Sequence, residues 1–148
     1  MKKKMLFVMA MIAAFVLFVP SVMAATTEVS SDLAGAVSSA ADGDTLKLTA
    51  DITVDSAIII DKELTIDLNN HKITIDDSVS NDCIQVKDGN LTVTGTGTIE
   101  EKVPYYGAIW VYGSTNKADT DYSVLVVDKN VTLSATTCIL FVVLPSTS

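Results

Sequence analysis

The chain has 148 residues, and its 18 acidic residues outnumber its 10 lysines, which gives a formal net charge of −8. Arginine is absent from the sequence. This composition argues against nucleic acid or anionic lipid as a partner, because phosphate recognition depends on clustered lysine and arginine.

The first 24 residues have the pattern of a signal peptide. Lys2, Lys3 and Lys4 precede an apolar run over residues 5–19, and small residues in 20–24 place a cleavage site after Ala24. The apolar run is too short for a membrane span. We therefore expect a secreted or surface-localised chain that does not insert into the membrane. Cleavage after Ala24 would remove three lysines and no acidic residue, so the net charge of the remaining chain would change from −8 to −11.

The next residues predict a linker and one short helix. Residues 25–30 are predicted as a linker, and residues 31–43 as an N-terminal capping helix with its stop at Gly43. Leu33, Val37 and Ala40 share one helical face, and Ser30 or Ser31 is available as the N-cap. From residue 44 to residue 148, β-branched residues dominate and the helical period disappears.

Three kinds of segment recur within residues 44–148. Four segments begin with a small residue and continue apolar: AIII (57–60), CIQV (83–86), AIWV (108–111) and CILF (138–141). Their second residues, Ile58, Ile84, Ile109 and Ile139, are 26, 25 and 30 positions apart. A second strand-like segment follows each of the first three, at 64–68, 91–95 and 123–127, and a third follows at 72–75, 97–100 and 131–134.

A repeat of three short strands with a period near 25 predicts a solenoid whose equivalent strands stack in parallel, about 4.8 Å apart. We count about three and a half coils, with the four isoleucines in one interior column. In LTIDL (64–68) the alternation places Leu64, Ile66 and Leu68 inward. The alternative for such a strand-rich chain is an antiparallel sandwich, which predicts no three-segment repeat.

The unit LTIDLNNHKITI (64–75), preceded by AVSSAADGDTLKL (36–48), resembles the first coils of right-handed parallel β-helix proteins of the pectate-lyase-like group. More narrowly, it is similar to the repeats of large secreted or surface-displayed bacterial proteins. The resemblance covers roughly residues 33 to 134 and implies an all-β fold. One departure is Asn70, where the family usually has glycine, but asparagine tolerates the left-handed conformation that the turn needs. The pattern specifies fold far better than activity.

The residues that could carry catalysis have simpler structural interpretations. His71, the only histidine, could be catalytic with Asp67 as the nearest carboxylate, or a turn residue with its ring over the outer surface, and we favour the turn. The lyases and hydrolases of this group combine clustered aspartates with a basic residue, often arginine, and this chain has no arginine. We therefore predict no catalytic residues and no cofactor. A weak calcium site remains an alternative for the aspartates of the turns, namely Asp42, Asp44, Asp76, Asp77, Asp119 and Asp121.

The aromatic stretch 103–113 is the candidate ligand-binding site. If Ile109 and Val111 face inward, Trp110 and Tyr112 face outward together, and Tyr106 lies at the turn leading in. Exposed rings on a flat sheet can stack on the apolar faces of sugars. The alternative is that the polar insertion 114–121 folds back over the rings.

The two cysteines and the end of the chain bear on assembly. Cys83 and Cys138 begin equivalent segments two coils apart, so about 9.6 Å would separate them, which is too far for a disulfide. The last coil has no polar cap after the apolar residues 139–144. We therefore expect either that the chain is the front piece of a longer protein or that it associates end to end through the open coil.

Taken together, these observations predict a non-catalytic, secreted or surface-displayed bacterial module for adhesion or carbohydrate binding, with an extracellular glycan or host surface as partner. One alternative is a fragment or relative of a polysaccharide lyase or hydrolase. Another is a purely structural stalk.

Overall fold

The computed structural model describes residues 23–76, 84–102, 107–112, 123–135 and 138–143, and the strands found there form three parallel sheets. The first sheet has the order β1 (Thr26–Val29), β2 (Asp44–Leu48), β5 (Glu63–Asp67), β8 (Asn90–Thr94), β11 (Val124–Val127). The second has the order β3 (Ile52–Val54), β6 (Lys72–Ile75), β9 (Gly97–Glu101), β12 (Val131–Ser134). The third has the order β4 (Ile58–Ile60), β7 (Ile84–Lys87), β10 (Gly107–Tyr112), β13 (Cys138–Val143).

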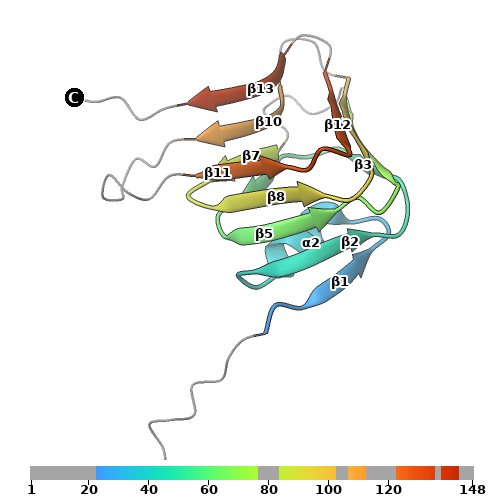
Figure 1. Ribbon diagram of the computed structural model, residues 1–148, viewed down its shortest axis with the longest axis vertical. Coiled ribbons are helices and arrows are strands. Elements are labelled where there is room, and N and C mark those ends of the chain that lie inside the picture. The colour runs from blue at the N-terminus through green and yellow to red at the C-terminus, as the bar shows by residue number, and fades with distance from the viewer. Residues whose placement is uncertain (1–22, 77–83, 103–106, 113–122, 136–137, 144–148) are drawn as a thin grey trace, which may run out of the picture.

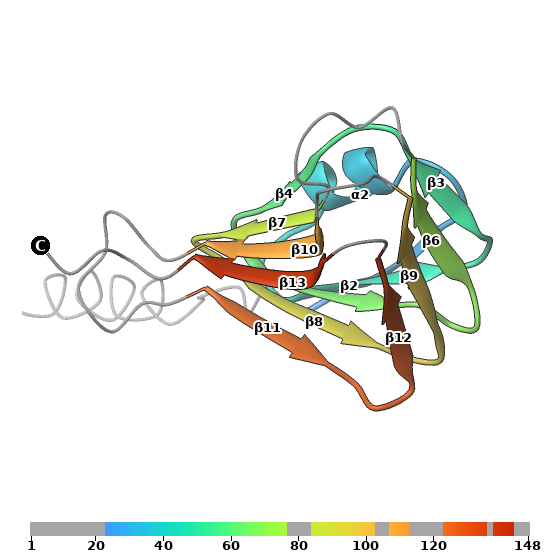
Figure 2. The same ribbon diagram turned by 90° about the horizontal axis from the view of Figure 1, so that it is seen from above.

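The path of the chain through these sheets is regular. After β1 and the helix α2 (Leu33–Ser39), the described strands visit the first, second and third sheets in the same order four times, and each passage adds one strand to each sheet. Figure 1 shows the strands stacked in layers, and Figure 2 shows the three sheets around one interior. Every described pairing is parallel, so the antiparallel sandwich is wrong. The arrangement is compatible with the predicted parallel β-helix.

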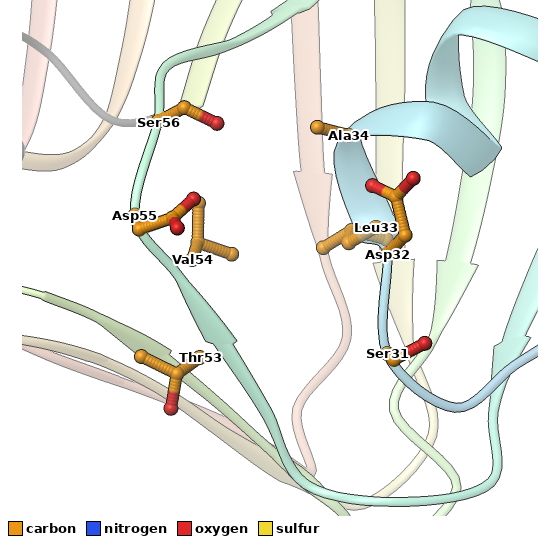
Figure 3. Close-up of a pocket in the computed structure, with 8 residues that line it drawn as sticks. All are labelled: Ser31, Asp32, Leu33, Ala34, Thr53, Val54, Asp55 and Ser56. Atoms are coloured by element: carbon orange, nitrogen blue, oxygen red, sulfur yellow. The ribbon is translucent and has the colours of Figure 1, made fainter.

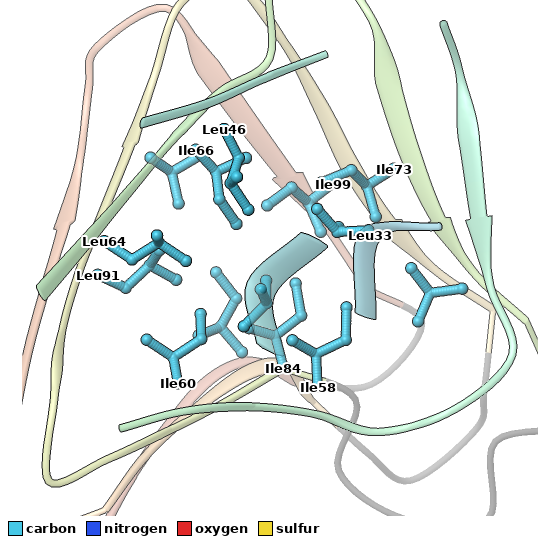
Figure 4. Packing of buried hydrophobic residues seen from close by; sticks show 14 of the residues in the cluster. Leu33, Leu46, Ile58, Ile60, Leu64, Ile66, Ile73, Ile84, Leu91 and Ile99 are labelled. Carbon is cyan, nitrogen blue, oxygen red and sulfur yellow. The ribbon is translucent and has the colours of Figure 1, made fainter. Parts of the chain in front are cut away.

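The core lies between the three sheets because each strand directs alternate side chains inward. In β5, Leu64 and Ile66 are 1% and 0% exposed, and they stand in register with Leu91 and Val93 of β8. Ile73 and Ile99 stack in the same way in the second sheet. Figure 4 shows side chains from all three sheets converging on this interior. Burial of a leucine or isoleucine side chain contributes roughly 1.5–3 kcal/mol, so these columns are the main source of stability.

The N-terminal elements differ in detail from the sequence prediction. Residues 25–30, predicted as a linker, contain β1. This strand pairs in parallel with β2 and so extends the first sheet by one strand. The helix is shorter than the predicted range 31–43, and its N-cap is Asp32 rather than Ser30 or Ser31, since the Asp32 side chain accepts a hydrogen bond from the Gly35 amide. Leu33 and Val37 are buried as expected.

The predicted isoleucine column is correct for three of its four members. Ile58, Ile84 and Ile109 stand in register, but the partner of Ile109 in β13 is Leu140, not Ile139. The reason is that residues 138–143 are apolar at every position, so their sequence contains no alternation to define the register. Cys83 lies outside the described residues, so the predicted distance between Cys83 and Cys138 stays a prediction.

The turn between β5 and β6 has the backbone that the sequence predicts. Asn69 and Asn70 have φ values of 46° and 67°, in the left-handed region where asparagine is tolerated. The Asn69 side-chain amide donates to the carbonyl oxygen of Leu48 (2.9 Å), one layer away in the stack. Asn70 therefore adopts the left-handed backbone at the position where the resembled family has glycine, and its neighbour Asn69 links this turn to the preceding layer.

Candidate functional site

The two predicted aromatic residues in the described part of the chain lie together on β10. Ile109 and Val111 are buried at 0% and 6% exposure, so the alternation of the strand turns Trp110 and Tyr112 to the outer side of the third sheet. Their ring centroids are 6.2 Å apart with an interplanar angle of 27°. Both residues are partly buried, and the two rings form one stacked pair.

The neighbouring strand β7 adds two polar side chains beside this pair. Gln85 stands in register with Trp110, and Lys87 with Tyr112, so each lies one strand spacing of about 4.8 Å along the sheet. Lys87 is exposed and forms no ion pair within the described part of the chain. We call Gln85, Lys87, Trp110 and Tyr112 the aromatic face. Sequence analysis missed Gln85 and Lys87, because their position beside the rings depends on the register between strands.

The remaining parts of the predicted site are not placed. Tyr106 and the insertion 114–121 lie outside the described residues, so the alternative that the insertion covers the rings stays a prediction.

Two of the aspartates considered as calcium ligands, Asp42 and Asp44, accept hydrogen bonds from backbone amides instead. Asp44 is 8% exposed, and its two carboxylate oxygens accept hydrogen bonds from the amides of Ala25 and Ala41, both at 2.8 Å. These hydrogen bonds lower the pKa of Asp44 from its ordinary value of 3.8. Asp42 accepts from the amide of Glu63 at 2.8 Å. Both carboxylates thus hold the N-terminal layers together, and sequence analysis gave them no such role.

No group of three or more histidine, cysteine, aspartate or glutamate side chains in the described ranges is arranged to hold a metal ion. Of the predicted calcium candidates, Asp77, Asp119 and Asp121 lie outside those ranges.

His71 has a carboxylate neighbour, but not the one expected. Its Nδ1 lies 3.3 Å from Oδ1 of Asp51, whereas the sequence suggested Asp67. The same Asp51 oxygen accepts a hydrogen bond from the Lys72 amide at 2.9 Å, which is the main reason that the pKa of Asp51 is lowered. The His71 and Asp51 side chains are 29% and 69% exposed. The pair therefore joins two successive turns at the surface of the stack.

Two open hollows lie beside α2, away from the aromatic face. One, of about 320 Å³, lies between the start of α2 and the connection from β3 to β4 (Figure 3). Asp32 and Asp55 are among the residues that line it. The other, of about 420 Å³, lies between α2 and β4 and includes Ile59 and Lys62. Lys62 Nζ donates to the carbonyl oxygens of Val37 and Ala40 at 3.3 and 3.1 Å, so this lysine holds the C-terminal end of the helix. The hollows are gaps where the helix meets the sheet edges.

Comparisons with protein-family models, with curated proteins and with solved structures found no match. Within the described ranges, the helix is far too short to cross a membrane.

Proposed function

We propose that this chain is a right-handed parallel β-helix of the type found in secreted and surface-displayed bacterial proteins, and that it binds carbohydrate without catalysing a reaction. The fold proposal is supported by the parallel register of the three sheets, by the fixed order in which the chain visits them, and by the resemblance of residues 64–75 to such repeats. Export rests on the signal-peptide pattern of residues 1–24, with cleavage after Ala24.

The observation that carries the binding proposal is the stacked pair of Trp110 and Tyr112 on the outer side of a sheet. A sugar ring has one apolar face of C–H groups, which an indole or phenol ring can cover, while its hydroxyl groups need hydrogen-bond partners at the edge. Gln85 offers both a donor and an acceptor, and Lys87 offers donors, beside the rings. The aromatic face therefore combines the two kinds of contact that a carbohydrate requires.

The test is a glycan array probed with the purified protein and with three variants. Trp110→Ala removes the larger ring and is expected to weaken binding about 30-fold, equivalent to about 2 kcal/mol for the loss of a central aromatic contact. Tyr112→Phe keeps its ring and should stay within about threefold of the original affinity. Lys47→Ala, on β2 of the first sheet, is the control and should bind like the unaltered protein.

The outcomes separate the proposal from its alternatives. An array without any binding would favour the structural stalk. Full binding by Trp110→Ala would remove the aromatic face as the site. Release of unsaturated uronate from pectin would replace the proposal by the lyase alternative. N-terminal sequencing of the exported protein tests secretion, and a first residue other than Ala25 would contradict the predicted cleavage.

A further inference from the structure

The last strand of the first sheet is covered less than the strands before it. Leu125 stands in register with Leu91 and Leu64, and Val127 with Val93 and Ile66. The earlier members of these two columns are 0–1% exposed, whereas Leu125 is only partly buried and Val127 is 36% exposed. The same change occurs in the second sheet, where Leu133 of β12 is only partly buried although its partner Ile99 is fully buried.

The outer side of β11 is apolar as well. Val124 and Val126 are 45% and 51% exposed, and they occupy columns that hold polar residues in the earlier strands. The register partners of Val124 are Asn90 and then Glu63, and those of Val126 are Thr92 and then Thr65. A parallel strand that is apolar on both sides is typical of a strand covered on both sides. β11 therefore has the composition of an interior strand, although it lies at an edge.

β11, β12 and β13 are the last strands of their sheets in the described part of the chain, and Figure 1 shows β11 beyond β8 and β13 beyond β10, at the same end of their sheets. We call this end, with the side chains of Val124, Leu125, Val126, Val127 and Leu133, the C-terminal end face. Strands at a sheet edge have backbone groups that can pair with another strand. At the opposite end, α2 inserts Leu33 and Val37 into the core, and β1 extends the first sheet.

Charge distinguishes the two ends. The segments 123–135 and 138–143 contain one aspartate, Asp128, and one lysine, Lys129. Residues 23–76, which form β1 to β6, contain ten acidic side chains and three lysines. Two C-terminal end faces therefore bring less like charge together than two of the acidic N-terminal ends would.

We propose that the protein dimerises through the C-terminal end face, with a second copy of this chain bound end to end about a twofold axis. The twofold axis reverses the direction of the stack, so β11 pairs antiparallel with β11 of the second copy, and β12 with β13. A single added strand covers one sheet edge, whereas a second copy brings three sheet edges to the same end. Pairing of β11 with its copy covers the inward side chains of Leu125 and Val127, and it places the outward side chains of Val124 and Val126 beside those of the second copy. This proposal does not depend on carbohydrate binding.

The test is sedimentation equilibrium of the purified protein from about 1 to 100 µM, with three variants. The unaltered protein is expected to reach a dimer plateau. Val126→Lys and Val124→Lys each place a charge at an exposed position of β11 and should raise the dimer dissociation constant at least about tenfold, since both copies bring the charge to the interface. Thr65→Lys, in the same column as Val126 but two strands away, should dimerise normally.

A protein that stays monomeric at 100 µM would overturn the proposal. A mass that keeps growing with concentration would also overturn it, because that result indicates open head-to-tail stacking. Unchanged dimers of both lysine variants would place the interface elsewhere. Far-ultraviolet circular dichroism of each variant shows whether the sheets are retained, so that loss of the dimer is read only from folded proteins.

Discussion

The three consecutive isoleucines of β4 allow a sharp test of the packing. Ile60 is 0% exposed and Ile59 is 54% exposed, although the two are neighbours with the same side chain. Replacing Ile60 by alanine removes three carbon atoms, worth about 2.4 kcal/mol at roughly 0.8 kcal/mol each. Its register partner Val86 is also fully buried, so the site cannot readily collapse, and the residual cavity raises the expected cost to about 3–4 kcal/mol. Ile59→Ala should cost less than about 0.5 kcal/mol.

The measurement is urea unfolding at 25 °C, followed by circular dichroism and by fluorescence of Trp110, the only tryptophan of the chain. Coincidence of the two transitions establishes that unfolding is two-state, which the comparison of free energies requires. Equal losses for Ile59→Ala and Ile60→Ala would refute the reasoning, because they would mean that β4 does not have one inner and one outer side. A larger loss of unfolding free energy for Ile59→Ala than for Ile60→Ala would mean that β4 directs Ile59, and not Ile60, into the core.

Two further predictions concern stability. The pKa of Asp44 is lowered in the folded state, so its carboxylate stabilises the fold above pH 3.8, and this stabilisation is lost as the pH falls through the lowered pKa. Asp44→Asn should therefore lose less stability than the unaltered protein between pH 7 and pH 3 in urea unfolding, and equal losses would contradict this role. A Cβ atom at Gly89 would lie 2.5 and 2.7 Å from the backbone nitrogen and oxygen of Lys62, so Gly89→Ala should cost more than about 2 kcal/mol. At Gly43, where space is open but φ is 85°, alanine should cost only about 1 kcal/mol, and thermal unfolding that ranks the two glycines in reverse would be evidence against the tight approach at Gly89.

Sequence alone predicted the repeated part of the fold and the orientation of the aromatic pair. The spacing of Ile58, Ile84 and Ile109 indicated equal chain lengths between equivalent strands, and these three residues do stand in register. Alternation placed Trp110 and Tyr112 on the same side of β10. Both inferences depend on local properties, namely the two-residue period of a strand and the length of one repeat.

Only the tertiary structure decided which residues meet between successive layers. It placed Asp51 beside His71, Lys87 beside Tyr112, and Leu140 rather than Ile139 in register with Ile109. It also paired β1 with β2, although residues 26–29 are not part of the repeat. These contacts join residues about 20 or more positions apart. They depend on the geometry of the corners and on backbone pairing, and the sequence pattern within any one strand contains neither.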